Sequence, residues 1–162
     1  MKSSELHAAA SELRTLTGMI IKVAKRDTER RLAASEAGIS GLQYGILRIL
    51  SGQDSTLSEL SHMLHREPAT LVPVVDALED KGLVKRGQDP KDRRRTPLTI
   101  TENGTAVLDR VPLVNENDVL VNALKELGDQ KVQRLLTLLR ELATQVSEDK
   151  NKVAKVNALG NS

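Results

Sequence analysis

The sequence predicts a mainly α-helical fold with one small β-hairpin. Apolar residues recur at helical spacing along most of its 162 residues. Residues 83–86 and 97–100 are instead strand-like, with Val, Ile and Thr among them. Asp89-Pro90 stands between them and is a turn signal, because Asp bonds the backbone ahead of it and Pro fixes φ. The chain is therefore expected to pack its helices around a single hairpin.

The composition excludes several classes of function. The absence of Cys excludes thiol catalysis, thiol redox switching and Cys-zinc sites, and it fits a cytoplasmic location. No apolar run reaches the roughly 20 residues that cross a bilayer, and the N-terminus has no signal core, so no membrane association is expected. With no Phe or Trp and one Tyr, the chain lacks the aromatic platforms that bind single-stranded nucleic acid.

Residues 4–34 form the first expected helix. One apolar stripe runs along it, in two interleaved sets with seven-residue spacing: Leu6, Leu13, Ile20, Ala9, Leu16 and Val23. A stripe of this length needs a partner, while the basic residues on the other faces are most simply solvated.

Three further helices precede the hairpin. Ser40 and Gln43 have capping-box spacing and begin the second helix. Ser58 is expected to cap a short third helix. Pro68 suits the first turn of a fourth helix, and Gly82 is placed to close it in the left-handed conformation. Two short helices joined by a tight turn and followed by a basic hairpin are typical of a winged helix-turn-helix, whose second helix enters the major groove.

Two longer helices follow the hairpin. Thr101 is expected to cap the fifth, which would continue through a kink at Pro112 to about Leu127. Asp129 is expected to cap the sixth, whose wide apolar stripe reaches Val146. These stripes favour a dimer interface over packing within one chain. A two-fold dimer would place the DNA-binding regions of its two subunits roughly 34 Å apart, which is about one turn of DNA.

The expected organisation has four parts. They are an N-terminal dimerisation helix in residues 1–38, a winged helix-turn-helix DNA-binding region in 39–101, C-terminal dimerisation helices in 102–147 and a polar tail in 148–162.

The hairpin carries a surplus of positive charge. Its basic residues outnumber Asp89 and Asp92, and they are Lys85, Arg86, Lys91, Arg93, Arg94 and Arg95. Such a cluster can neutralise phosphates or enter a narrow minor groove. A hairpin of this kind alone would usually be a solvated loop. Its position after two short helices instead favours double-stranded DNA as the partner.

Several motifs resemble the MarR family of transcriptional regulators. They are Gln43-Tyr44, Pro68-Ala69-Thr70-Leu71, the run Leu-Glu-Asp-Lys-Gly-Leu-Val at 78–84, and Asp89-Pro90-Lys91-Asp92-Arg93-Arg94. The resemblance covers about residues 5–147. It implies a homodimeric regulator, usually a repressor, that binds a palindromic operator. It also implies release by a small, often phenolic or lipophilic molecule bound between the DNA-binding and dimerisation regions, and it requires no cofactor.

The resemblance also implies roles for individual residues. Asp92 would pair with Arg94 to shape the wing tip, while an arginine there enters the minor groove. Val72 or the methyl group of Thr70 could read a thymine methyl. The full set of implied DNA contacts is Arg66, Pro68, Ala69, Thr70, Val72, Pro73, Lys85, Arg86, Asp92, Arg93, Arg94 and Arg95.

The recognition helix departs from the family pattern. Many relatives have a basic residue where Pro73 stands and a hydroxyl cap where Glu67 stands. From Glu67 to Asp80 there is no Lys or Arg, whereas several acids are present. The helix therefore cannot attract phosphates by itself. The alternative is a winged-helix scaffold that binds protein without reading DNA sequence.

Ligand and metal sites have weaker signals. Tyr44 and Arg48, one turn apart, suit an aromatic anion, although such a pair is also ordinary packing at the edge of a core. His62 and His65, with Glu59 three residues earlier, could offer ligands to zinc, but phosphate contact suits these histidines better and no metal is expected. No nucleophile elbow or phosphate-binding loop is present, so an enzyme is not expected.

Overall fold

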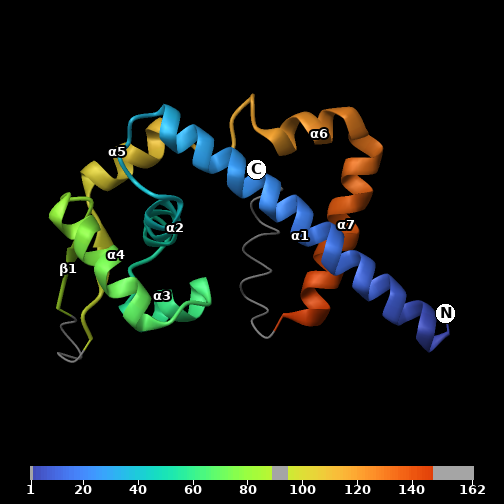
Figure 1. Cartoon of the computed structure of the whole chain (residues 1–162), viewed down its shortest axis with the longest axis horizontal. Helices are drawn as coiled ribbons and strands as arrows, with labels where there is room; N and C mark the ends of the chain where they lie inside the picture. The colour runs from blue at the N-terminus through green and yellow to red at the C-terminus, as the bar shows by residue number, and fades with distance from the viewer. Residues whose placement is uncertain (1, 89–94, 148–162) are drawn as a thin grey trace. The chain divides into compact units, whose positions relative to one another are not determined.

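The computed structural model describes residues 2–88 and 95–147 (Figure 1). In chain order the elements are α1 (Ser3–Ala34), α2 (Gly41–Leu50), α3 (Leu57–Leu64), α4 (Pro68–Asp80), β1 (Val84–Arg86), β2 (Leu98–Ile100), α5 (Glu102–Arg110), α6 (Val119–Leu127) and α7 (Asp129–Val146). The expected fold class, helices with one small hairpin, is confirmed. The chain divides into two compact units, Met1–Asn115 and Glu116–Ser162, and each is described by itself.

The ends of the helices are fixed as expected in four places. The Ser40 hydroxyl accepts from the Gln43 backbone N–H at 3.2 Å, and the Gln43 side chain accepts from the Ser40 N–H at 2.9 Å. Pro68 opens α4. Gly82 has a φ of +66° beyond its end. The Thr101 hydroxyl accepts from the Gly104 N–H at 3.1 Å and caps α5.

The cap expected at Ser58 is wrong, because α3 begins one residue before it. Thr56 is the N-cap, and its hydroxyl accepts from the Glu59 N–H at 3.3 Å. The Glu59 carboxylate accepts in return from the Thr56 N–H at 2.7 Å. This reciprocal box satisfies two backbone donors at once, so it prevails over a cap at Ser58.

The expected kinked helix from Thr101 to Leu127 is also wrong. Helix α5 ends at Arg110, because a residue before proline disfavours helical backbone and Val111 has φ −127° and ψ 75°. A new helix, α6, then begins after Asp118, whose side chain accepts from the Leu120 N–H at 2.8 Å.

Asp129 does not cap the last helix as expected. Gly128, with a φ of +78°, occupies the N-cap position of α7, and Asp129 is the first helical residue. Its carboxylate therefore lies in the first turn, where it favours the helix through the dipole. The described part of α6 and α7 contains no buried residue. No described helix is long and apolar enough to cross a bilayer.

The hairpin pairs β1 with β2 in antiparallel register, with Val84 opposite Ile100 and Arg86 opposite Leu98. Ser55 also forms an isolated antiparallel bridge with Leu98 of β2, which the sequence did not predict. Its N–H donates to the Leu98 carbonyl at 3.2 Å, and the Leu98 N–H donates back to the Ser55 carbonyl at 2.9 Å. The loop before α3 is thereby joined to the wing.

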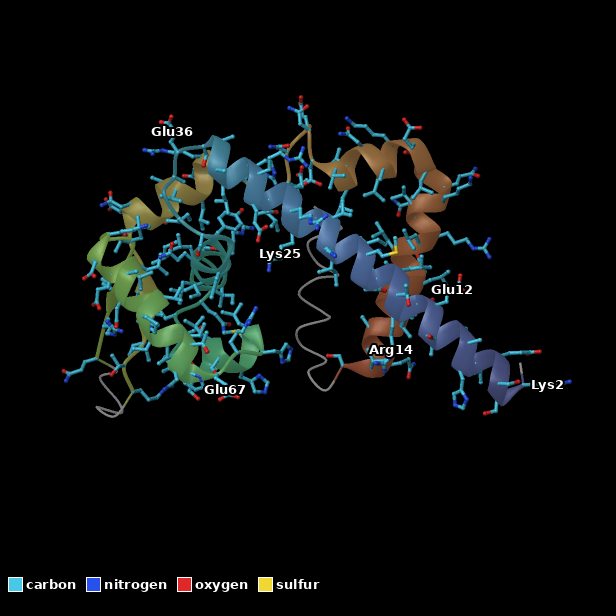
Figure 2. All side chains as sticks on the ribbon, in the orientation of Figure 1. Lys2, Glu12, Arg14, Lys25, Glu36 and Glu67 are labelled. Carbon is cyan, nitrogen blue, oxygen red and sulfur yellow. The ribbon has the colours of Figure 1, made fainter. Side chains whose placement is uncertain are left out.

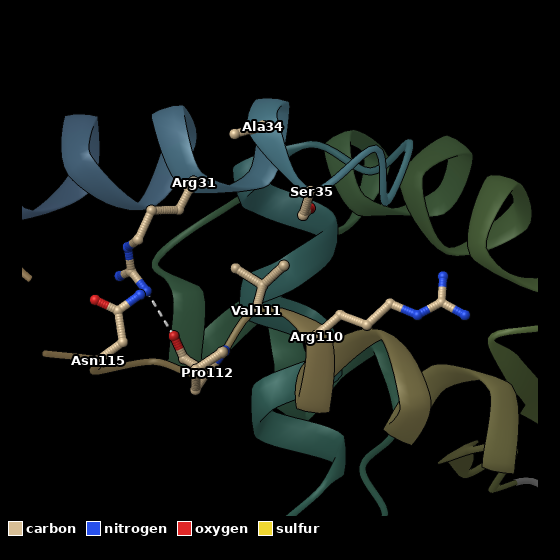
Figure 3. Close-up of a pocket in the computed structure, with 7 residues that line it drawn as sticks. All are labelled: Arg31, Ala34, Ser35, Arg110, Val111, Pro112 and Asn115. Carbon is tan, nitrogen blue, oxygen red and sulfur yellow. Dashed lines mark hydrogen bonds between the residues drawn. The ribbon is translucent and has the colours of Figure 1, made fainter. Parts of the chain in front are cut away.

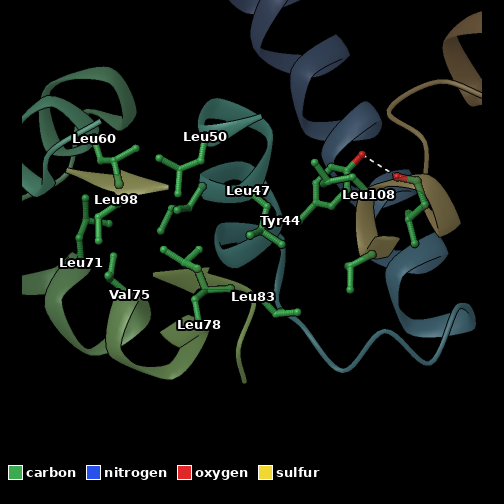
Figure 4. Packing of buried hydrophobic residues seen from close by; sticks show 14 of the residues in the cluster. Tyr44, Leu47, Leu50, Leu60, Leu71, Val75, Leu78, Leu83, Leu98 and Leu108 are labelled. Carbon is green, nitrogen blue, oxygen red and sulfur yellow. Dashed lines mark hydrogen bonds between the residues drawn. The ribbon is translucent and has the colours of Figure 1, made fainter. Parts of the chain in front are cut away.

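The core of the first unit is almost wholly aliphatic (Figure 4). Its completely buried members come from α2, α3 and α4: Ile46, Leu47, Leu60, Leu71, Val75 and Leu78. Figure 1 shows α2 between α3, α4 and α5, so this helix carries the middle of the core. Helices α4 and α5 and the wing pack on α2. This packing fixes the direction of the face of α4 that points away from α2.

Candidate nucleic-acid interface

The recognition helix α4 has one buried face and one exposed face. Leu71, Val75 and Leu78 face the core. The implied base-contacting residues lie on the exposed sides of the first two turns, and they are Ala69, Thr70, Val72 and Pro73. Val72 is 40% exposed. The structure therefore leaves this half of α4 open to a partner.

The turn between α3 and α4 sets the direction of this face. His65 has a φ of +49° and ends α3 in the left-handed conformation. The Arg66 N–H donates to the Ser61 carbonyl at 3.1 Å, and the Ser61 hydroxyl donates to the Arg66 carbonyl. Glu67 follows as the N-cap of α4, with an exposed side chain that makes no capping hydrogen bond (Figure 2). The turn thus presents Arg66 and Glu67 just before the first turn of α4.

The second half of α4 is acidic, and Arg86 of the wing binds its carboxylates. The Arg86 guanidinium lies 2.5 Å from Asp76 Oδ1 and also pairs with Glu79. The hydrogen bond with Asp76, together with the charges of both acids, raises the pKa of Arg86. The structure places Arg86 on the acids of α4, and its expected contact with DNA stays a prediction.

Arg95, three residues before β2, makes a similar contact. Its guanidinium lies 2.7 Å from Glu59 Oε1 at the beginning of α3. The Glu59 carboxylate also accepts from the Thr56 N–H and hydroxyl. These bonds, with the Thr56 backbone bond as the largest cause, lower the pKa of Glu59. Two arginines of the wing therefore join it to the helices beside it.

Two other cations of the interface make no ion pair in the described part of the chain. They are Arg66, in the turn before α4, and Lys85, in the middle of β1. Both are exposed. Asp92, Arg93 and Arg94 lie outside the described residues, so their expected roles at the wing tip stay predictions.

Tyr44 is buried in the core of the first unit. Only 3% of it is exposed, and its hydroxyl donates to the Val111 carbonyl at 2.8 Å. Burial raises its pKa, while the charges of Arg48 and Arg31 act in the opposite direction. Arg48 is exposed on the same helix. The pair as a ligand site stays a prediction.

A pocket of ≈ 240 Å³ lies beside the end of α5 (Figure 3). It is lined by Arg31, Ala34, Ser35, Arg110, Val111, Pro112 and Asn115. The Arg31 guanidinium donates to the Pro112 carbonyl at 2.6 Å and to the Leu113 carbonyl at 3.0 Å. It also pairs with the buried Asp27 carboxylate at 3.2 Å. Figure 3 shows Arg110 extending away from Arg31, so the two cations do not converge on one point.

The sequence contained a signal for Arg31 that was missed. Asp27 occupies the next seven-residue step of the α1 stripe after Leu6, Leu13 and Ile20. A charged residue at an apolar position, with an arginine four residues later, indicates a buried pair.

The two histidines of α3 do not form a metal cluster. The ring centroids of His62 and His65 are 6.5 Å apart. Glu59, the third ligand considered, is engaged with Thr56 and Arg95. Over residues 2–88 and 95–147, no group of three His, Cys, Asp or Glu side chains could hold a metal ion.

Comparisons with known proteins place this geometry in a family. A model of the MarR family matches residues 39–96. A Thauera aromatica protein named for transcriptional regulation of the hcr operon is 33% identical over 125 residues, covering 76% of this chain and 74% of that protein. A MarR variant from E. coli complexed with operator DNA has a TM-score of 0.66 at 24% identity, covering 81% of this chain and 93% of that one.

CouR from Rhodococcus jostii, bound to p-coumaroyl-CoA, has the same fold. Its TM-score is 0.63 at 21% identity, with 86% of this chain and 97% of that chain covered. The winged helix-turn-helix with its exposed recognition helix, the family match over residues 39–96 and the 33% identical relative lead to one assignment. This chain belongs to the MarR family of transcriptional regulators.

Proposed function

We propose that this chain is a sequence-specific double-stranded DNA-binding repressor, without enzymatic activity, that acts as a homodimer in the cytoplasm. The observation that carries the proposal is the open first half of α4 directly after Arg66, together with Lys85 on β1; both cations are exposed and make no ion pair in the described structure. An exposed helix face with one such cation in the turn before it and another on the wing suits a major groove between phosphates. The operator DNA bound by the E. coli MarR variant supports the same use of the fold.

The test is a fluorescence-anisotropy titration with two duplexes at two salt concentrations. One duplex comes from the region upstream of the gene, and the other is a scrambled version with the same composition. We expect tighter binding to the upstream duplex and weaker binding at higher salt, because phosphate contacts release counterions. Equal, weak binding to both duplexes would refute sequence-specific recognition.

We infer a two-fold dimer from apolar side chains that remain exposed. On α1 they include Leu6, Met19, Ile20 and Ile21, each more than half exposed. On α7 Leu138 and Val146 are exposed by 55% and 72%. Exposed apolar surface repeated along long helices indicates an interface, and a second copy of the chain fits a palindromic operator.

We further propose that a small phenolic or lipophilic molecule releases the DNA. CouR, which has the same fold, binds p-coumaroyl-CoA. The pocket beside α5 offers this chain a candidate site, because polar and apolar side chains line it together. A panel of hydroxybenzoates and their thioesters, added to the protein–DNA complex, should lower the anisotropy for at least one member. Unchanged anisotropy across the panel would count against this class of ligand.

A further inference from the structure

We propose that α4 selects its operator chiefly through the C5-methyl groups of pyrimidines, with Val72 and Pro73 as the specificity-determining residues. This inference rests on the proposed function and names the chemical feature of the DNA that the helix reads. Its basis is an apolar patch at the outer face of a recognition helix whose polar side chains are few or already engaged.

The exposed half of α4 has almost nothing with which to form hydrogen bonds to bases. The side chains that make bidentate contacts are Arg, Lys, Asn and Gln, and none occurs in residues 68–75. The Thr70 hydroxyl is the single polar side chain in that stretch. One hydroxyl, which bonds to several different base edges, cannot distinguish the four base pairs.

The acids farther along the helix do not replace the missing groups. A free carboxylate could accept from the amino group of cytosine. Asp76 and Glu79, however, both bind the Arg86 guanidinium. Their charge is directed to the wing, and the third acid, Asp80, is the last residue of the helix, so we take its first two turns as the part that reads the bases.

Ala69, Val72 and Pro73 form a continuous apolar patch. They are three and four residues apart, so their side chains are neighbours on the helix surface. All three are exposed. Pro73 has no N–H to donate to the Ala69 carbonyl, so the helix gives up an internal hydrogen bond and holds a rigid ring at this face.

The complementary feature of a major groove is a methyl group. Thymine presents a C5-methyl there, and apolar side chains contact it favourably. A methyl group removed from water against Val72 or Pro73 would raise affinity about fourfold. Two symmetric half-sites would give about 15-fold for one methyl position in each.

The experiment begins with the duplex that the full-length protein selects from a random library. Each thymine of one half-site, with its symmetric mate, is then replaced by uracil, which removes the methyl group and keeps every hydrogen-bonding atom. We expect about a 15-fold loss of affinity at one or two positions and less than about twofold elsewhere. At those positions, 5-methylcytosine paired with guanine should restore most of the affinity, whereas unmodified cytosine should not.

Protein variants assign the methyl contact to its residue. For Val72→Ala, the ratio of the affinity for the thymine duplex to the affinity for the uracil duplex should fall to about one at one position. The ratios at the other positions should not change. Val114→Ala is the matched control, because Val114 is also an exposed valine, at 58%, and lies outside α4. This control should show the same loss of affinity at each uracil position as the natural protein does; we call this set of losses the uracil profile.

The outcomes separate this inference from the proposed function. If the selected duplex binds far better than a scrambled one but every uracil duplex binds equally well, methyl reading is refuted and sequence-specific binding stands. If Val72→Ala and Pro73→Ala both keep the uracil profile, the assignment to these residues is refuted. If the library yields no preferred duplex, the proposed function itself is refuted, and this inference is refuted with it.

Discussion

From its two ion pairs, we expect Arg86 to support DNA binding by neutralising the acids of α4 rather than by touching phosphate. Arg86→Ala should weaken duplex binding about tenfold, because Asp76 and Glu79 would then repel the DNA. Adding Asp76→Asn and Glu79→Gln to that variant should restore most of the affinity. The measurement is anisotropy at several salt concentrations. A phosphate contact would instead lower the salt slope by about one per subunit and would not be rescued.

A control for net charge is available on the same chain. Glu12→Gln with Asp109→Asn removes two exposed carboxylates from α1 and α5. If this pair rescues Arg86→Ala as well as the α4 pair does, the effect of Arg86 is one of overall charge, and its local role is contradicted.

The pKa of the Tyr44 hydroxyl provides a test of how deeply this side chain is buried. Its pKa is raised by burial above the ordinary value of 10.0, so the unfolded chain loses this proton first as the pH rises. The contribution of Tyr44 to the free energy of unfolding is therefore complete below pH about 10 and falls as the pH increases through the folded-state pKa. Because Tyr44 is the only tyrosine and the chain has no Trp, its phenolate absorbance can be followed without interference.

Tyr44→Phe should remove this alkaline loss of stability. The variant also leaves the Val111 carbonyl without its hydroxyl donor, so near neutral pH it should unfold about 1 kcal/mol more easily. Urea denaturation at a series of pH values would measure both effects. A Tyr44 titration at the ordinary tyrosine pKa would show that the ring is more open to water than described.

At the scale of elements, the close approach of α5 to the wing depends on Gly104. A Cβ atom there would lie 2.3 Å from the Leu83 carbonyl oxygen and 2.7 Å from Ile100 Cγ1. Gly104→Ala should therefore reduce the free energy of unfolding by about 1–3 kcal/mol, since backbone must shift to admit the methyl group. Gly18→Ala is the matched control, because a Cβ at Gly18 meets nothing within 4 Å.

The control should behave in the opposite way. Alanine at Gly18 should stabilise α1 by up to about 1 kcal/mol, through its higher helix propensity. Urea denaturation of both variants gives the comparison. Equal effects of the two substitutions would mean that α5 does not pack on the wing as closely as described.

The ends of the elements also explain which predictions were correct. Ser40, Pro68 and Thr101 were predicted correctly because each cap depends on residues within three positions along the chain. Pro112 was misjudged as a kink although local signals were present: the residue before proline disfavours helical backbone, and Asp118 caps the next helix by accepting from the Leu120 N–H. The bridge between Ser55 and Leu98 was missed because the two residues lie far apart in the sequence.

At the scale of the whole molecule, the charge pattern could be predicted but its internal pairing could not. The sequence identified a basic wing and an acidic recognition helix. That Arg86 binds the α4 acids and Arg95 binds Glu59 depends on how the hairpin folds back on the helices. Such tertiary contacts leave no periodic signal, unlike the apolar stripes of α1 and α7.

The apolar stripe of α1 should control assembly. Ile20→Glu places a charge at a residue that is 54% exposed in one chain and should abolish the dimer. Light scattering coupled to size-exclusion chromatography measures the mass in solution. Lys22→Glu is the control: it changes the charge more but lies outside the stripe. A monomeric natural protein, or a dimeric Ile20→Glu variant, would contradict this interface.

The arginine links of the wing have a consequence for the DNA itself. Arg86 joins β1 to α4, and Arg95, which precedes β2, joins the wing to α3. Because of these links, we expect the wing, α3 and α4 to bind a duplex as one rigid body. The distance between α4 in the major groove and the wing in the minor groove is then fixed by the protein. Any adjustment must then come from bending or narrowing of the double helix, whose stiffness varies with sequence. Base pairs that this protein never touches should therefore affect how tightly it binds.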